Sequence, residues 1–595
     1  MSTQTFPEPL EARVAPAALI DAFTVKYRDI DGDNVTITSN QPIFDAATVN
    51  SVLKFSTGTV DGGMVKKQAL WEIDLDALAS PASAAGLNLT VLADGEDKAN
   101  VGFIHAKLLD VGSVQIDGDL GRIRVGDDTT STLGMQMLKV DSMGLFGLKS
   151  QAPGGDLISV FRGGLDELAV TKSVSSATLV ALGNDTEIDG NLDGYFGKIT
   201  IGGGLVGGSG GYSGAIVATG PMPSVEIHGN LSGGSGDHSG YVGFAQGAII
   251  GLPDIFSSGG PVGSVKVGGS VRGGTGSDSG SIQTAGAESI SVGGDVLGNK
   301  AARSGFIYSI ENMGLVEIGG DLQGGAGLGS GRVENNDGLL DKVFIGGKVT
   351  GGKGSHSGTV YSDSELGLVF IKGDLKGGAG LISGSVGANG SIELVHIGGN
   401  VSSSTGENSG RISADDLLGT VLIDGDVKGT AANPVWITGG GLSGDSTAAL
   451  DYVSVGGGVS FTNFGAGFSQ EADTADNPDG IIREISVKGN WHASNALAGV
   501  IAGADGNYGT GDDALASGTN SGSITATISR VTIGGKLSGS SPSGDHFGIV
   551  AQLVKQVSIG GLGITLKSGP ANDVVNLPGL NDFTIREIGA IIRGG

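Results

Sequence analysis

Two short acidic loops contain the residue types that bind calcium. In the first, Asp29, Asp31 and Asp33 alternate around Gly32, so that three carboxylates share one tight turn. Calcium prefers carboxylate and carbonyl oxygens, and this spacing predicts a calcium loop. The pattern departs from an EF-hand because glycine comes early and Asn40 stands where the last glutamate would be. The alternative is a solvated hairpin turn.

The second acidic loop lies at residues 503–513 and contributes Asp505, Asn507, Asp512 and Asp513. It resembles the DGxxGTxDD loops of bacterial secreted proteins, in which oxygen ligands would order a glycine-rich segment. Calcium is therefore the predicted cofactor of both loops. The alternative for this loop is an acidic surface segment that binds no metal.

Motifs for catalysis find little support in the chain. The run Gly207–Gly211 matches G-x-S-x-G, but it lies in a glycine turn without the strand-to-helix elbow that exposes a nucleophilic serine. Runs resembling G-x-G-x-x-G are not followed by a predicted helix whose N-terminus would bind phosphate. Cysteine is absent, which excludes disulfides, zinc-thiolate sites and thiol nucleophiles. We expect a protein that is not an enzyme.

Composition narrows the class of protein further. Of 595 residues, 114 are glycine, only 5% are aromatic, and the formal net charge is -27. Such a negative surface repels phosphate backbones, so nucleic acid is not expected as a partner. No apolar run reaches the length of a membrane-spanning helix, so no membrane span is expected. The glycine excess predicts many tight turns between short strands.

A repeat of about 26 residues accounts for most of the chain. Its first landmark is a V-x-I triplet, which ends at Ile201, Ile227, Val267, Val292, Ile318, Ile345, Ile371, Ile397 and Ile423. A Ser-Gly pair begins 12 residues after the triplet in eight of these units, as at Ser330 after Ile318. The triplet alternates apolar and polar residues, which predicts a strand with one buried face. We expect the intervening Gly-Gly-x-Gly to supply positive φ angles for a turn.

These repeats predict an all-β chain, a parallel β-helix of about 17 coils whose Val and Ile columns bury one another. We assign residues 1–21 to a disordered leader, 22–109 to a small β-rich capping domain and 110–595 to the β-helix. Long insertions are expected at 246–261, 462–480 and 499–522, and insertions in a solenoid usually carry its site chemistry. The last coils are placed on Val557–Ile559 and Phe583–Ile585, and residues 582–588 around the second triplet would be the last coil or its cap.

The middle residue of each triplet should face outward. On four neighbouring coils this column contains Phe344, Phe370, His396 and Leu422. An exposed apolar ladder of this kind indicates an interface for another chain or for sugar rings. The alternatives are that a loop covers the ladder, or that the inward and outward assignments are exchanged by one residue.

A family resemblance adds a location. Residues 10–16, Leu-Glu-Ala-Arg-Val-Ala-Pro, resemble the LEPR-type tag of secreted glycine-rich repeat proteins from planctomycetes and Verrucomicrobia, with Ala12 where proline is common. Residues 101–106, residues 111–123 and the GGDLxGGxGxxSG coils resemble the same proteins. The resemblance implies a β-solenoid and an extracellular or cell-surface location, but no activity. No standard signal peptide is visible at residues 1–20.

Together these features predict a non-enzymatic structural or adhesive protein, such as matrix, surface-layer or adhesin material, stabilised by calcium. Its expected partners are further copies of itself or a cell-surface polysaccharide. The alternative is a carbohydrate-binding or carbohydrate-active β-helix, similar to polysaccharide lyases, that uses the insertion loops.

Overall fold

The computed structural model describes residues 17–30, 32–56, 68–78, 86–95, 98–127, 132–183, 194–244, 260–470, 474–517, 524–540 and 544–589. Strands dominate these residues, and they form a parallel β-helix, as the repeat predicts. The chain divides into two compact units. The first contains Met1–Gly229 and Ser239–Pro261, and the second contains Asn230–His238 and Val262–Gly595.

The first unit opens with an antiparallel meander. β1 (Ala18–Asp21), β2 (Thr24–Arg28), β3 (Asn34–Ser39) and β6 (Asn88–Ala93) pair in that order. The β2–β3 pair is the hairpin expected around the first acidic loop. β5 (Leu70–Asp74) pairs in parallel with β7 (Val101–Ala106), and β6 pairs in parallel with β8 (Val111–Val125). Parallel pairing continues through β9 (Met135–Met143) and β11 (Gly164–Val170).

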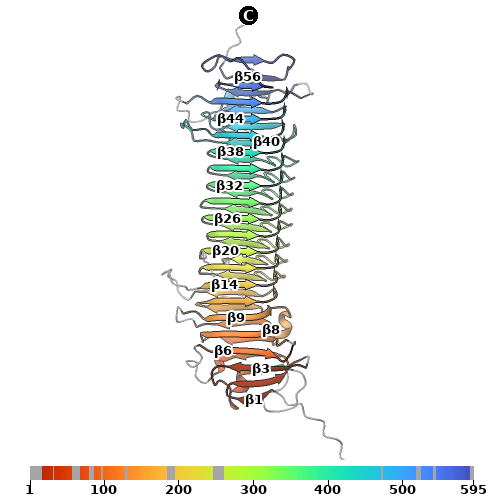
Figure 1. Cartoon of the computed structure of the whole chain (residues 1–595), viewed down its shortest axis with the longest axis vertical. Helices are drawn as coiled ribbons and strands as arrows, with labels where there is room; N and C mark the ends of the chain where they lie inside the picture. Colours follow the sequence, from red (N-terminus) through yellow and green to blue (C-terminus); the bar gives the residue numbers. More distant parts are fainter. Residues whose placement is uncertain are drawn as a thin grey trace, which may run out of the picture. The chain divides into compact units, whose positions relative to one another are not determined.

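In the second unit, the coils from β20 (Val262–Val267) to β43 (Thr462–Ala466) each contain three short strands. One coil consists of β26 (Met313–Ile318), β27 (Leu322–Gln323) and β28 (Arg332–Asn335). These strands pair in parallel with β29 (Leu340–Ile345), β30 (Val349–Thr350) and β31 (Val360–Ser362) of the next coil. Figure 1 shows the first strands of successive coils, such as β26, β32 (Leu366–Ile371) and β38 (Leu418–Ile423), stacked in sequence order.

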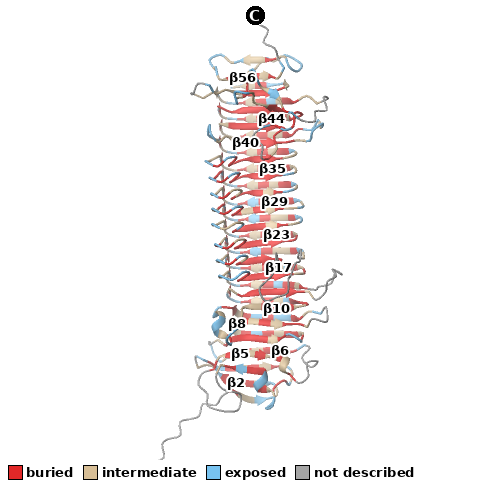
Figure 2. Cartoon of the chain, turned by 180° about the vertical axis from the view of Figure 1, so that it is seen from behind, coloured by how far each residue is buried: buried red, intermediate tan, exposed pale blue. Residues whose placement is uncertain are grey.

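The core of this unit is a set of apolar columns. In the β26 triplet, Val316 and Ile318 are fully buried while Glu317 between them is exposed. Leu322 of the second strand and Val333 of the third are also fully buried. Burying a side chain of this size contributes about 1.5–3 kcal/mol, and each one packs on its counterparts in the adjacent coils. Figure 2 shows these buried strands in red.

The glycines of Gly-Gly-x-Gly have a different role from the one predicted. Positive φ occurs instead on both sides of the repeat serine, as at Arg303 (φ 48°) and Gly305 (φ 64°) around Ser304. The Gly-Gly-x-Gly residues are needed because neighbouring coils approach closely. A Cβ on Gly324, for example, would lie 2.6 Å from the backbone nitrogen of Gly358 on the next coil.

Two sets of polar side chains hold the turns. The Ser330 hydroxyl accepts the N–H of Gly325 at 2.9 Å and donates to the Gly327 carbonyl at 2.8 Å, and equivalent serines do the same in other coils. The Asp or Asn before the second strand accepts a backbone N–H from the next coil. The donor and acceptor pairs include Asp321 to Asp295, Lys348 to Asp321, Asn400 to Asp374, Asp426 to Asn400 and Gly458 to Asp426.

The C-terminal end corrects one predicted coil. The triplet Val557–Ile559 forms β53 and continues the first-strand sheet by pairing with β49 (Thr527–Ile533). Phe583–Ile585, in contrast, belongs to β56 (Phe583–Glu587), which pairs with the third-type strand β51 (Phe547–Ala551). An alternating apolar triplet occurs in both sheets, so the pattern alone does not distinguish them.

Candidate functional site

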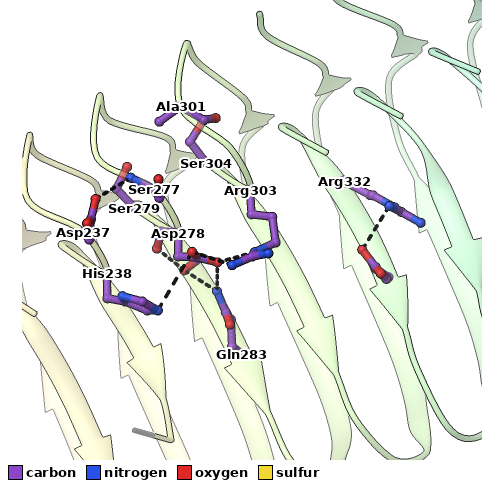
Figure 3. A network of polar contacts seen from close by, with 12 residues as sticks. Asp237, His238, Ser277, Asp278, Ser279, Gln283, Ala301, Arg303, Ser304 and Arg332 are labelled. Atoms are coloured by element: carbon purple, nitrogen blue, oxygen red, sulfur yellow. Dashed lines mark hydrogen bonds and ion pairs between the residues drawn. The ribbon is translucent and has the colours of Figure 1, made fainter. Parts of the chain in front are cut away.

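The strand after Ser-Gly presents its outer face to a network of ionic side chains. Asp278, which is 2% exposed, accepts from Arg303 Nε at 2.6 Å and from Arg303 Nη2 at 2.9 Å. Gln283 Nε2 donates to the same carboxylate at 3.0 Å, and His238 Nε2 lies 3.9 Å from it. Figure 3 shows these four side chains converging from three coils.

This network occupies a position that the sequence analysis did not single out. His238, Asp278 and Arg303 each precede a Ser-Gly pair and each has a positive φ, between 48° and 55°. The hydrogen bonds that Arg303 donates to the Asp278 carboxylate raise the pKa of Arg303. The Asp278 carboxylate and the Arg303 guanidinium therefore pair across adjacent coils, and this pairing stabilises the stacking of those coils. In each of these coils the residue lies directly before the repeat serine, and this constant spacing is the sequence signal that would have identified the network.

A second polar group lies further along the same face. Arg332 Nη1 is 3.2 Å from Glu334 Oε2, and its guanidinium lies 4.4 Å from the centre of the Tyr361 ring. The Tyr361 hydroxyl hydrogen-bonds to Asp363 Oδ1 at 2.6 Å. Burial raises the pKa of both Tyr361 and Glu334. These groups also bridge adjacent coils.

The first predicted calcium loop is held by its own backbone. Asp29 is 5% exposed, and its Oδ1 accepts the N–H groups of Gly32 at 3.0 Å and Asp33 at 2.9 Å. The Asp29 N–H in turn donates to the Asp33 carbonyl at 2.9 Å. Asp31 lies outside the described residues. The carboxylate of Asp29 therefore acts as a turn acceptor, and calcium binding by this loop stays a prediction.

Loop 503–513, the second predicted calcium loop, is anchored to the segment that precedes β51. Asn507 Nδ2 donates to the Gly544 carbonyl and Asn507 Oδ1 accepts the His546 N–H, each at 3.2 Å. Asp505 and Asp512 are connected through the Asp505 N–H, which donates to Asp512 Oδ2 at 3.2 Å. The Thr510 hydroxyl, which donates to Asp512 at 2.6 Å, is the leading cause of a lowered Asp512 pKa.

Asp513 differs from the other acids of this loop. Burial raises its pKa to about 7, although the Gly509 N–H donates to its Oδ2 at 2.6 Å. Its other oxygen is buried and has no hydrogen-bond partner among the described residues. The four predicted ligands thus serve partly as loop anchors, and whether they bind calcium stays a prediction.

A cavity of about 510 Å³ lies beside this loop. Its floor comes from β40 (Val435–Gly439), β43 (Thr462–Ala466) and β46 (Asn495–Ala498), which supply Trp436, Asn463 and Asn495. Asn507 and Tyr508 of the loop also line the cavity, as does Phe547 of β51. Since β43 begins at Thr462, the first residues of the predicted insertion 462–480 are part of a coil. Within the insertion 499–522, residues 502–508 contribute to the cavity.

The predicted outward ladder is present in register. Phe344, Phe370, His396 and Leu422 pair in adjacent first strands, and Phe344 is 36% exposed. The ring centres of Phe344 and Phe370 are 6.4 Å apart, and those of Phe370 and His396 are 5.1 Å apart. The other three side chains are half-buried. The ladder is thus a partly exposed stripe.

One further cluster lies in the first unit. Among the described residues, Glu72, Asp74 and His105 are the single group of three His or acidic side chains close enough to share a metal ion. Lys54 Nζ already lies 3.1 Å from Glu72 Oε2 and 2.7 Å from Asp74 Oδ2. The hydrogen bond that His105 donates to the Glu72 carboxylate is the leading cause of a raised His105 pKa. The Lys54 ammonium already contacts both carboxylates, so it competes with a metal ion for their oxygens.

Comparisons with family models, with curated proteins and with solved structures find no match for this chain. No helix among the described residues is long and apolar enough to cross a membrane.

Proposed function

We propose that the protein is a non-enzymatic structural or adhesive component of an extracellular matrix or cell surface. The observation that carries this proposal is that the polar side chains of the repeat hydrogen-bond within and between coils. Ser330 and its equivalents close turns within a coil, and Asp321 and its equivalents bind the backbone of the next coil. The recurring hydroxyl and carboxylate groups thus serve cohesion between coils.

Surface chemistry supports the same proposal. The net charge of -27 favours solubility and the binding of divalent cations, and the acidic loops offer oxygen ligands for calcium. The ladder at Phe344, Phe370, His396 and Leu422 offers a stripe for self-association. The resemblance of residues 10–16 to a tag of secreted repeat proteins supports the location.

A second candidate function is carbohydrate binding, with or without cleavage. The cavity beside loop 503–513 favours it, because aromatic rings and amide groups line the same cavity. The Asp278 and Arg303 pair gives less support to catalysis, since the two groups already neutralise each other at 2.6 Å.

Immunogold labelling of intact cells that make the protein tests the proposed location, and light scattering of the purified full chain tests self-association. We expect label on the outer surface, and particle mass that rises with protein concentration and falls in a Phe344→Ser, Phe370→Ser variant. Glu317→Ser, on the same outward column, is the matched control. Label confined to the cell interior would overturn the proposal.

A further inference from the structure

The cavity beside loop 503–513 is built before any ligand arrives. Tyr508 is 8% exposed and packs with Trp436, Leu497 and Val550 in one apolar cluster. The loop is also fixed by the hydrogen bonds of Asn507 to Gly544 and His546. Because apolar packing and hydrogen bonds to the backbone both hold this loop, it is ordered before binding, which reduces the entropy lost when a ligand binds. Its volume of about 510 Å³ lies within the range of small-molecule sites, roughly 300–1,000 Å³.

The floor offers an amide donor to a ligand. Asn495 Nδ2 donates to Asn463 Oδ1 at 2.9 Å, and Asn495 Oδ1 accepts the Gly548 N–H at 2.7 Å. This chain of bonds fixes both side chains. Among the described residues, Asn463 Nδ2 donates no hydrogen bond, so its N–H groups are available to a hydroxyl oxygen in the cavity.

The walls offer aromatic surface. Trp436, Phe461, Tyr508 and Phe547 all line the cavity. Phe461 and Phe547 meet edge to face, with ring centres 6.5 Å apart. The C–H groups of a sugar ring carry partial positive charge and are attracted to the negative faces of aromatic rings. Rings beside an amide donor therefore suit a ligand with both an apolar face and hydroxyl groups.

The charged groups around the cavity restrict the class of ligand further. Of the described residues that line the cavity, Asp545 is the one carboxylate, and the Ser540 hydroxyl donates to its side chain. His546 places Nδ1 2.9 Å from the Tyr508 carbonyl and Nε2 3.2 Å from the Thr584 hydroxyl, so both ring nitrogens are engaged. No lysine or arginine lines the cavity among the described residues. An anionic sugar would therefore meet repulsion without a compensating cation.

We propose that this cavity binds a neutral saccharide unit of a surface polysaccharide. The inference deepens the proposed adhesive function, and it identifies the ligand class and the residues that hold it. Asn463 donates to a sugar hydroxyl, Phe461 and Phe547 contact the ring faces, and loop 503–513 encloses the unit. The chain would thus adhere to a glycan through a site built on the third-strand sheet.

Titration of the full chain with cellohexaose, laminarihexaose and mannohexaose, followed by calorimetry and tryptophan fluorescence, tests this site. We expect at least one neutral hexasaccharide to bind, and a trigalacturonate probe to bind at least about tenfold more weakly. The fluorescence change should disappear in Trp436→Phe, because Trp71 and Trp491 do not line the cavity.

Two variants separate recognition from folding. Asn463→Asp removes the donor but keeps the Oδ1 that accepts from Asn495. Phe461→Ala is compatible with the backbone, because Ala493 occupies the equivalent position of the next coil with φ 43° against 46° at Phe461. Each should weaken binding about tenfold, whereas Glu317→Ala, outside the cavity, should leave it unchanged.

The inference is overturned if none of the three neutral hexasaccharides binds, if trigalacturonate binds best, or if both cavity variants bind as the unchanged chain does. Because surface labelling and self-association do not depend on this cavity, such a result would leave the proposed structural role intact. Loss of surface labelling would, in contrast, remove the proposed function itself.

Discussion

The Oδ1 of Asp321 accepts the backbone N–H of Lys348 on the next coil at 3.0 Å. The N–H of Asp321 itself donates to Asp295 Oδ1 of the preceding coil at 2.9 Å. One side chain per coil thus extends the hydrogen bonding of the sheets through a turn. The same position carries asparagine at Asn400 and Asn490, which accept in the same way.

Removing one acceptor of this ladder should destabilise the second unit. Asp321→Ala leaves the Lys348 N–H without its partner, and we expect a loss of about 1–2 kcal/mol in the free energy of unfolding. Asp321→Asn keeps the acceptor and should retain most of the stability. Thermal unfolding followed by circular dichroism checks both, with Glu317→Ala as an exposed control. Equal melting of the Ala and Asn variants would contradict the role of the ladder.

Glycine should be required at Gly324 because of space. A Cβ there would lie 2.6 Å from the Gly358 nitrogen, so Gly324→Ala must displace backbone of the adjacent coil. We expect a loss of about 1–3 kcal/mol, the usual range for overpacking. Gly511→Ala, where no atom lies within 4 Å, is the matched control and should melt unchanged. Similar melting of the two variants would show that the coils are less tightly spaced.

Loop 503–513 should loosen as pH rises. Burial raises the Asp513 pKa to about 7, so the folded loop favours the protonated acid more than the unfolded chain does. The stabilising effect is complete below the ordinary aspartate pKa of 3.8 and is lost as pH rises through about 7. Limited proteolysis within the loop should therefore accelerate between pH 5 and 8. Asp513→Asn should flatten this dependence, and an unaltered profile in that variant would count against the assignment.

Calcium should raise the melting temperature if the acidic loops bind it. Ligand at 100 times its dissociation constant stabilises the folded state by about 2.7 kcal/mol. The increase should shrink in Asp512→Ala and in Asp31→Asn, and it should persist in Asp341→Asn, which alters an exposed acid outside both loops. Melting curves in calcium and in EDTA that superimpose would exclude the calcium component.

Much of the fold could be predicted from the sequence. Each triplet from Ile201 to Ile423 ends a first strand. Its two apolar residues point inward and the residue between them points outward, and a shift of one residue would expose both apolar side chains. The two-residue strands such as Leu322–Gln323 are too short to give a periodic signal. Glycine is needed at Gly324 because of a contact with the next coil, which the local sequence does not reveal. The local sequence therefore predicted a turn with positive φ angles instead.

The site was less predictable. The insertion at 499–522 was expected to carry chemistry, but the cavity also needs Trp436, Asn463 and Phe547, which are distant in sequence. Trp436 and Asn463 meet because they pair in register on the adjacent strands β40 and β43, and the glycine-rich turns obscure this register in the sequence. The pairing of Asp278 with Arg303 likewise depends on coil stacking.

The central claim, that the chain binds surface material without cleaving it, is tested most directly by incubating the full chain with the neutral polysaccharides cellulose, laminarin and mannan. Sedimentation or affinity electrophoresis measures retention, and a reducing-end assay measures new chain ends in the same samples. The account predicts retention on at least one of them, weakened in Phe461→Ala, with no increase in chain ends. New chain ends that disappear in Asp505→Ala or Asp512→Ala would contradict it.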